Sequence, residues 1–333
     1  MAGIAAAAAL TAPDAPAYEQ FLACGWHGEM DYLARNADSR RDIRAWMPEA
    51  RSVLMCGFSY GEPGAQKPRS RPGHGRLARY ARRPDYHGLL RSRMNAVRDW
   101  LREQAPGVKA VAFCDMSPIL ERAYARAAGL GWQGKNTLLI GPRLGSYFLL
   151  AGLAIDLDLP VDSPEPDHCG SCRRCLDACP TDAFARERAL DASRCVAYLN
   201  IELKGPVPEG LRAGVGDWVY GCDACQEVCP WNRFEAPARA LPPPKVASEL
   251  PLDQLAGPGS VGVRARLKGL PVARAVRRRL TRNALLAMGN SGDERHRPVL
   301  EGFAAGADPL LAEQARWSLA RLDDSARRGT ITR

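Results

Sequence analysis

"CGSCRRCLDACP" (169–180) and "GCDACQEVCP" (221–230) are two cysteine runs that each end in Cys-Pro. Together with Cys195, which lies between them, they contain eight of the 11 cysteines of the chain. The first run has the Cys-x2-Cys-x2-Cys-x3-Cys-Pro spacing of bacterial ferredoxins, in which three thiolates bind one [4Fe–4S] cube and the fourth binds the other cube. The sequence therefore predicts a ferredoxin-like region with two [4Fe–4S] clusters.

The ligand sets are predicted by crossing the two runs in the ferredoxin manner. One set is Cys169, Cys172, Cys175 and Cys229, and the other is Cys179, Cys195, Cys222 and Cys225. Structural zinc is the alternative, although zinc sites usually show two separate Cys-x2-Cys pairs. The remaining residues, Cys24, Cys56 and Cys114, are expected to be small buried hydrophobic residues rather than ligands.

Composition places the chain among globular proteins with an anionic partner. Its 333 residues are 46% hydrophobic, and 46 basic against 37 acidic residues give a formal charge of +9, which favours nucleic acid as the partner. No apolar run approaches the roughly 20 residues of a membrane helix, and no basic segment precedes the alanine tract of "MAGIAAAAALTAPDAP". We expect a cytoplasmic protein without membrane association, a weakly ordered N-terminus and no disulfides, which are rare in a reducing compartment.

The chain before the cysteines alternates between strand and helix patterns. Apolar, β-branched or aromatic runs predict strands at 52–60, 108–115, 136–140 and 146–155, and amphipathic patterns predict helices at 88–105 and 119–130. This order implies a sheet covered by helices. The domains are expected at 1–160 (α/β), 161–245 (ferredoxin-like) and 246–333 (helical).

Asp115 is the candidate reactive residue of the α/β domain. It follows the apolar run "VKAVAFC", at a strand end where α/β domains often present functional groups. The alternative is that it only caps the next helix or completes a turn. No Gly-x-Gly-x-x-Gly or Gly-x4-Gly-Lys-Ser/Thr loop is present, so a nicotinamide or ATP site is not indicated. "DYHGLL" (85–90) has Leu90 where the Asp-x-His-x-x-Gly motif of histidine-ligated cobalamin enzymes needs glycine.

The last third of the chain is basic and helical. Residues 261–283 contain eight arginines and lysines and no acid, which is typical either of a solvated helix face or of a surface that contacts phosphates. Residues 283–322 then show two helix pairs interrupted at "GNSGDERHRP" and "AGADP", the rhythm of a HEAT-like repeat. We expect this region to dock nucleic acid.

These parts together resemble the epoxyqueuosine reductases, which complete queuosine synthesis in tRNA. The resemblance extends from about residue 40 to residue 322. Its distinctive stretches are the two cysteine runs, "RYARRPDYH" (79–87), "CDMSPILERAYARAAGLGWQGKNTLLIGPRLGSYFLL" (114–150), "YLNIELKG" (198–205) and "RNALLAMGNSG" (282–292). The family fold would be an α/β cobalamin-binding domain, a ferredoxin-like two-cluster domain and a C-terminal HEAT-like repeat.

The resemblance implies a cytoplasmic, monomeric oxidoreductase that reduces the epoxide of epoxyqueuosine at the tRNA wobble position. Its cofactors would be two [4Fe–4S] clusters and a cobalamin without a histidine lower ligand, fed by a low-potential electron donor. Asp115 would lie over the corrin as the proton donor. The residues that correspond to corrin or cluster-side positions are Arg40, Leu139, Leu150, Ala197, Cys222 and Asp223. The best candidates for contacts to the anticodon stem-loop are Lys204, Arg212, Arg274, Arg278, Arg282 and Asn283.

The implied chemistry needs these parts. Removal of the epoxide oxygen as water takes two electrons and two protons, and a [4Fe–4S] cube passes one electron at a time, so a two-electron centre such as cob(I)alamin is required. Two other classes share some of these features. A cobalamin-dependent reductive dehalogenase has the same cofactors but is generally exported, and a ferredoxin fused to an RNA-docking module would bind no corrin. The absorbance spectrum of anaerobically purified protein distinguishes the last class.

Overall fold

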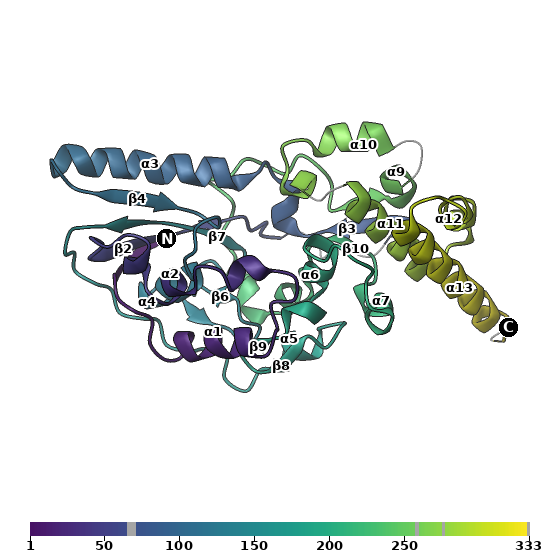
Figure 1. Cartoon of the computed structure of the whole chain (residues 1–333), viewed down its shortest axis with the longest axis horizontal. Coiled ribbons are helices and arrows are strands. Elements are labelled where there is room, and N and C mark those ends of the chain that lie inside the picture. The colour runs from purple at the N-terminus through teal and green to yellow at the C-terminus, as the bar shows by residue number, and fades with distance from the viewer. Residues whose placement is uncertain (65–70, 257–259, 275–276, 332–333) are drawn as a thin grey trace.

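The computed structural model describes residues 1–64, 71–256, 260–274 and 277–331. The molecule is elongated, with a mixed α/β region around the N-terminus at one end and a group of helices leading to the C-terminus at the other (Figure 1). The short helices of the cysteine-rich segment lie between the two ends.

A four-stranded antiparallel sheet in the order β1-β2-β7-β4 forms the centre of the α/β region. Its strands are β1 (Ala2–Ala6), β2 (Ser52–Ser59), β4 (Ala110–Phe113) and β7 (Phe148–Ile155). The strands expected within 52–60, 108–115 and 146–155 are confirmed. β2 and β7 pair along their whole length, from Ser52 opposite Ile155 to Ser59 opposite Phe148.

Two expectations for this region are wrong. The N-terminus is not weakly ordered, because β1 pairs with β2 as the edge strand of the sheet. Gly3 permits this position, since a Cβ there would lie 2.0 Å from the carbonyl oxygen of Ala128. The strand expected at 136–140 is reduced to the two residues of β6 (Leu139–Ile140), which pair with β5 (Trp132–Gln133).

Helices cover both faces of the sheet. Helix α3 (Tyr86–Gln104) packs on β4 and β7, and α4 (Glu121–Ala127) packs on β1, β2 and β7. Successive residues of a strand point to opposite faces, so Leu153 lies in the core beneath α3 and Ala154 in the core beneath α4. Both expected helices are confirmed, although α4 is shorter than the 119–130 pattern predicts. The remaining helices of this region are α1 (Asp14–Ala23) and α2 (Ala37–Arg41).

The cysteine-rich segment consists of short elements. They are α5 (Arg174–Asp177), β8 (Phe184–Arg186), β9 (Ala189–Leu190), α6 (Val196–Ile201), α7 (Glu209–Val215), β10 (Trp218–Tyr220) and α8 (Ala224–Glu227). A small sheet in the order β10-β3-β11 joins this segment to both neighbours, because β3 (His74–Leu77) precedes the cysteines and β11 (Glu249–Pro251) follows them. All three expected domains contribute one strand to it.

The C-terminal helices share one core with the small sheet. They are α9 (Leu252–Ala256), α10 (Ser260–Leu267), α11 (Arg277–Ser291), α12 (Arg297–Ala304) and α13 (Pro309–Ile331). Helix α13 packs against both α11 and α12. Connections between α11, α12 and α13 lie within the two interruptions expected at 289–298 and 305–309, although α11 continues to Ser291, so this segment has three α-helices in place of two pairs.

Candidate functional site

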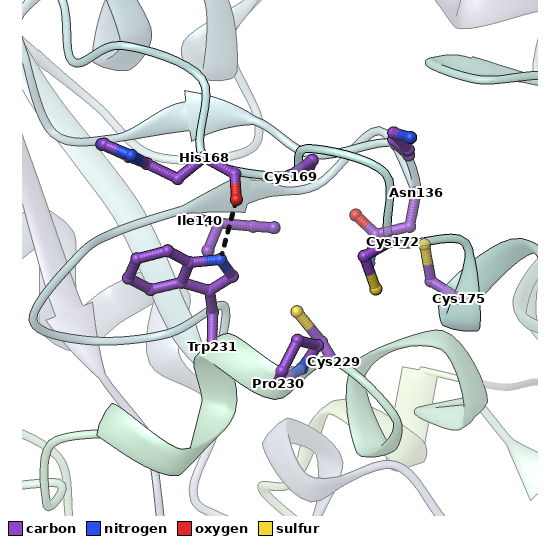
Figure 2. A pocket seen from close by; sticks show the side chains of 10 residues that line it. Asn136, Ile140, His168, Cys169, Cys172, Cys175, Cys229, Pro230 and Trp231 are labelled. Atoms are coloured by element: carbon purple, nitrogen blue, oxygen red, sulfur yellow. Dashed lines mark hydrogen bonds between the residues drawn. The ribbon is translucent and has the colours of Figure 1, made fainter.

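The two cysteine runs meet because helices α5 and α8 lie against each other. Cys169, Cys172, Cys175 and Cys229 line one cavity of about 120 Å³, which we call the first cluster site. Figure 2 shows the sulfur atoms of Cys172 and Cys175, from the first run, and of Cys229, from the second, facing the same space. These four are the first predicted ligand set. Among the described residues, no three His, Cys, Asp or Glu side chains are placed as ligands of a single metal ion.

The other four cysteines, Cys179, Cys195, Cys222 and Cys225, form what we call the second cluster site. Burial raises the pKa of the Cys225 thiol, and the charges of Cys195, Asp223, Cys175 and Cys179 raise it further, in that order. Burial also raises the pKa of Cys222, again with a contribution from Cys195. Charge interactions of this kind link the four thiols of the set, and they also link Cys225 to Cys175 of the first cluster site. That the four share one cluster stays a prediction.

Both sites favour a positively charged occupant. Burial, followed by the charges of Cys229 and Cys169, raises the pKa of the Cys175 thiol to about 11. Neutral thiols are poor metal ligands, and iron stabilises the thiolate form directly. The donor set therefore fits iron–sulfur clusters. The cysteines outside the pattern differ from one another, because Cys114 is buried, Cys56 is half-buried and Cys24 is exposed, contrary to the expectation of burial for Cys24.

Aromatic side chains wall the first cluster site. Trp132 donates a hydrogen bond from Nε1 to Sγ of Cys169 at 3.4 Å, and its ring lies edge-on to Trp231 with centroids 4.8 Å apart. Trp231 donates from Nε1 to the carbonyl oxygen of His168, as Figure 2 shows. Lys135, buried beside the cavity, forms an ion pair with Glu187 at 2.9 Å. These groups shield the cysteines from water and place a donor on one sulfur.

Asp115 lies where β4 ends, at the start of the loop that leads to α4. Its φ of +58° is in the left-handed region, which Asp and Asn tolerate better than most residues. Its side chain is 58% exposed, and Oδ2 accepts hydrogen bonds from Tyr86 Oη at 3.0 Å and from His87 Nε2 at 2.8 Å. The backbone N–H of Asp115 donates to the carboxylate of Glu121 on α4. Asp115 is thus held in place with part of its carboxylate open to solvent.

His87 connects Asp115 to a second carboxylate. Its Nδ1 lies 2.5 Å from Oδ1 of Asp85, the N-cap residue of α3, and its side chain is only 9% exposed. We call Asp85, Tyr86, His87, Asp115 and Glu121 the Asp115 site. The sequence pattern that introduced "DYH" as an imperfect cobalamin motif contained three of these residues, but nothing in the sequence placed them against a residue 28 positions later. Asp85, Tyr86 and His87 were missed for that reason, and Glu121 was missed because only the packing of its helix brings it to the backbone of Asp115.

Tyr32 and Glu202 border the Asp115 site, which already includes Glu121. Burial, Glu202 and Asp115 together raise the pKa of Tyr32 to about 12. Burial, with Asp115 adding to it, raises the pKa of Glu121 to about 8, which favours its protonated form. Glu202 follows α6 in the cysteine-rich segment. The Asp115 site is therefore bordered by residues from both sides of the molecule.

The predicted corrin neighbours in the α/β region and α6 are one polar residue, Arg40, and three apolar residues. Arg40 is buried and donates to the carbonyl oxygen of Tyr32 at 3.0 Å, and within the described residues its buried Nε has no hydrogen-bond partner. Such an atom fits a polar group of a bound cofactor. Leu139 is buried, and Leu150 and Ala197 are half-buried.

Asp223 is 2% exposed, and burial raises its pKa to about 6. It accepts hydrogen bonds from the backbone of Arg79 and from the side chain of Gln226. It lies beside Cys222 in sequence and is closed off from solvent. Asp223 is therefore placed on the cluster side of the molecule rather than on an open surface.

The predicted RNA contacts are not on one surface. Lys204 and Arg278 are exposed, and Arg278 makes a two-bond ion pair with Asp308. Arg212 is buried against Glu313 and Trp317. The backbone of Arg274 ends a 3-10 turn, and its side chain lies outside the described residues.

Arg282 and Asn283 are inside the protein, contrary to their assignment to an RNA surface. Arg282 is 0% exposed and donates to the carbonyl oxygens of Leu199, Leu203 and Gly205. Asn283 donates to the carbonyl oxygens of Asn200 and Val219. A basic run does not reveal such a role, because the carbonyl groups that bury the arginine come from α6 and the residues after it.

The fold and the cysteine sites define an iron–sulfur oxidoreductase that couples a mixed α/β region to a double-cluster region. Residues 168–232 match the family model described as "4Fe-4S double cluster binding domain", and residues 40–116 match "Epoxyqueuosine reductase QueG, DUF1730". The epoxyqueuosine reductase of Pseudomonas aeruginosa is 38% identical over 311 residues, covering 91% of this chain and 86% of that protein. The chain belongs to the epoxyqueuosine reductase family.

Solved structures agree with this assignment. An epoxyqueuosine reductase crystallised with an epoxyqueuosine-modified tRNA-Tyr stem loop superposes with a TM-score of 0.85 at 26% identity, covering 97% of this chain and 86% of that one. The enzyme of Bacillus subtilis, with a catalytic loop named for its aspartate swung out of the active site, gives a TM-score of 0.84 at 27% identity and the same coverage. None of the helices in the described ranges combines the length and apolar character that a membrane crossing requires.

Proposed function

We propose that the chain reduces the epoxide of epoxyqueuosine to queuosine at the wobble position of tRNA, the last step of queuosine synthesis. The observation that carries the proposal is similarity to epoxyqueuosine reductases over nine-tenths of the chain, 91% in the case quoted above. The geometry is compatible with it, because one molecule combines two gathered sets of cysteines with an exposed, hydrogen-bonded carboxylate. The reaction converts an epoxide, two electrons and two protons into an alkene and water.

The cysteine-rich segment is assigned the electron path. The first and second cluster sites would each hold a [4Fe–4S] cluster, reduced one electron at a time by a low-potential donor. Cobalamin, when bound, supplies a two-electron nucleophile that neither cluster provides. The residues that would hold or border it are Arg40, Asp115, Leu139, Leu150, Ala197, Cys222 and Asp223. We propose cobalamin without a histidine lower ligand, and His87 in particular is not placed to be one, because both of its ring nitrogens face carboxylates.

The Asp115 site is assigned the proton path. Its exposed carboxylate can reach a substrate oxygen, while Tyr86 and His87 fix its orientation from behind. A positioned acid of this kind typically accelerates a proton transfer by about 10²–10⁴-fold. The structure of the Bacillus subtilis enzyme, described with its catalytic aspartate loop swung out, is consistent with such a residue being carried on a mobile loop in that relative.

The C-terminal helices are assigned to tRNA. We infer that α11, α12 and α13 form a HEAT-like module that docks the anticodon stem-loop, with direct contacts from Lys204, Arg278 and Arg274 and with Arg212 holding the neighbouring surface in shape. Arg282 and Asn283 would support this module from inside. The modified base would then be splayed out of the loop toward Asp115, as single-stranded bases are commonly read.

The wider organisation follows from this assignment. We divide the chain by role into an α/β catalytic domain (1–160), a two-cluster domain (161–245) and a docking domain (246–333). The three are joined structurally, because β3, β10 and β11 form one sheet. We propose a cytoplasmic monomer, since the tRNA substrate and the electron donor both act as separate partners.

The test is anaerobic reconstitution and single turnover. Protein loaded with iron, sulfide and cobalamin should contain about eight iron atoms per chain and a corrin spectrum. Chemically reduced enzyme should then convert epoxyqueuosine to queuosine in a tRNA anticodon stem-loop, measured by mass spectrometry of the digested nucleosides. Stoichiometric zinc, or clusters without corrin and without conversion, would contradict the proposal.

A further inference from the structure

The Asp115 site contains a histidine held between two carboxylates. His87 Nδ1 lies 2.5 Å from Oδ1 of Asp85, and Nε2 lies 2.8 Å from Oδ2 of Asp115. An ionised carboxylate can only accept hydrogen bonds, and imidazole donates from both nitrogens only when it is protonated. The geometry therefore selects the imidazolium form of His87, with one N–H directed at each carboxylate.

This arrangement affects the role of Asp115. A carboxylate that accepts hydrogen bonds from an imidazolium and from the Tyr86 hydroxyl is stabilised in its ionised form. The transferable proton of the site then rests on Nε2 of His87, one hydrogen bond behind the exposed carboxylate. Asp115 alone would be a poor store of a proton at neutral pH.

We propose that His87 is the proton reservoir of the site, that Asp85 holds it protonated, and that Asp115 relays its proton to the departing epoxide oxygen. The inference rests on the proposed function and deepens it. As the first carbon–oxygen bond breaks, the Nε2–H bond of His87 breaks and its proton moves to Oδ2 of Asp115. The carboxylic acid formed in this way then gives that proton to the departing oxygen, which leaves Asp115 ionised again. Two electrons come from the reduced iron–sulfur enzyme, and the second proton comes from water through the same path after His87 is protonated again. The products are the alkene and water.

The surroundings of His87 support a retained charge. Burial disfavours the imidazolium, but hydrogen bonds and charge interactions with Asp115 and Asp85 outweigh burial and raise the pKa of His87. The Tyr86 ring stacks on the imidazole with centroids 4.1 Å apart. On α4, Glu121 faces Asp115, and burial raises its pKa to about 8, which favours its neutral form.

Other charged and titratable groups border the same space. Tyr32 and Glu202 face Asp115 from outside α3, and Asp115 contributes to the raised pKa of each of them. Cys114 precedes Asp115, and burial raises its pKa, so it is neutral. Arg91, one turn along α3 from His87, is the cation that interacts with Cys114. Because the two ring nitrogens of His87 face Asp85 and Asp115, removal of the Asp85 charge should lower its titration midpoint.

The first test measures protonation directly. The chain has five histidines, so the holoenzyme with isotope-labelled histidine gives a tractable NMR spectrum, in which His87→Gln assigns the His87 resonance. We expect its titration midpoint above the ordinary value of about 6.5 and a fall of about one unit or more in Asp85→Asn. Asn keeps the N-cap of α3. A midpoint at or below the ordinary value, or one that Asp85→Asn does not move, overturns the proposal.

The second test links that proton to the reaction. Single-turnover rates are measured against pH for wild type, Asp85→Asn and His87→Gln, with iron and corrin content determined in each. The raised pKa means that His87 stays protonated to higher pH, so the wild-type rate should fall only above that midpoint. In Asp85→Asn the pH at which the rate falls should decrease by the shift in midpoint measured by NMR. The rate of His87→Gln should be about 10²-fold lower at pH 7 and should no longer fall with the titration of His87.

The matched control is His74→Gln. His74 contacts the carbonyl oxygen of Pro72 and lies outside the Asp115 site, so the same substitution there should leave the profile unchanged. If wild type fails to convert the substrate, the proposed function fails. If wild type converts it and Asp85→Asn keeps the wild-type profile, only the relay is wrong. If His87→Gln does not fold, the pH profile of Asp85→Asn still tests the proton relay.

Discussion

The first cluster site and the Asp115 site are assembled in different ways. Three of the four cysteines of the first cluster site come from seven consecutive residues, 169–175, and the fourth follows a short helix that packs against the first run. The Asp115 site brings together the start of α3, the end of β4 and the start of α4, and it faces Glu202 from the cysteine-rich segment. Local spacing fixes the first arrangement, and long-range packing fixes the second.

This difference determines how each site should respond to mutation. In the first cluster site the backbone presents the thiols, so loss of one ligand removes the occupant while most of the fold remains. In the Asp115 site the side chains hold one another through hydrogen bonds, so conservative substitutions should change protonation and rate before they change structure.

The largest effect is expected from Cys229→Ser, which tests how the two runs share the clusters. In the crossed arrangement, Cys229 serves the same cluster as Cys169, so the double variant Cys169→Ser with Cys229→Ser should lose about four of eight iron atoms. Adding Cys222→Ser to Cys229→Ser should instead remove both clusters. Iron and sulfide analysis with electron paramagnetic resonance of the reduced protein measures this, and turnover should be lost in every case.

Cys24→Ser is the matched control, since Cys24 is exposed and outside both runs. It should keep full iron content and activity. The reverse pattern, with both clusters lost in Cys169→Ser with Cys229→Ser and one cluster lost in Cys222→Ser with Cys229→Ser, would show that each run binds its own cluster. The ligand sets of the first and second cluster sites would then be wrong.

A loss of about 10²-fold or more in single-turnover rate, or about 3 kcal/mol of transition-state stabilisation, is expected for Asp115→Asn. Asn retains the shape of the side chain and accepts the left-handed backbone of this position, with its φ of +58°, so the loop should persist. Clusters and corrin should bind as in wild type. A corrin-loaded Asp115→Asn enzyme with full activity would remove Asp115 from the mechanism, and reduced stability with normal turnover would limit its role to holding Tyr86 and His87 in place.

The sequence predicts those features of the fold and site that depend on residues close together in the chain. Strands β2, β4 and β7, helix α3, the gathering of the cysteines and the place of Asp115 at a strand end all follow from patterns a few residues long. β1 could not be anticipated, because an alanine tract carries little strand preference and its pairing depends on the exposed edge of β2.

The Asp115 site could not be predicted from the sequence either, because it also depends on contacts between distant parts of the chain. "DYH" was visible in the sequence, but its meaning depends on α3 packing beside β4, which brings His87 to Asp115. The prediction that Arg282 of the basic run contacts RNA was wrong for a related reason. Arg278 and Arg282 belong to the same basic run, so the sequence alone does not distinguish them. Arg282 is buried because it donates to carbonyl groups of α6 and of the residues after it, whereas Arg278 is exposed and pairs with Asp308.

Arg282→Met and Arg278→Met should therefore separate fold from binding. Arg282→Met leaves buried carbonyl groups without their charged donor and should cost about 3 kcal/mol of unfolding free energy, measured by denaturant or thermal melts of the holoprotein. Arg278→Met should leave stability nearly unchanged. It should weaken binding of the anticodon stem-loop and lower the slope of log affinity against log salt by about 0.7–0.9, the value of one phosphate contact.

The opposite pattern would contradict the structure. A stable Arg282→Met protein with a reduced salt slope would show that Arg282 reaches RNA, and an unchanged slope in Arg278→Met would make the exposed part of the basic run a solvated surface.

The smallest effect is expected from Trp132→Phe in the wall of the first cluster site. Phe keeps the aromatic packing against Trp231 but lacks the N–H that Trp132 donates to Cys169 Sγ at 3.4 Å. Such a hydrogen bond stabilises the more negative, reduced cluster, so its loss should lower the reduction potential. If the bond contributes about 1 kcal/mol, the shift is about 40 mV for one electron. Spectroscopic redox titration measures it, with the cluster of the second site as the internal reference. A shift of both potentials, or of neither, would show that Trp132 acts through general packing and not through the sulfur of Cys169.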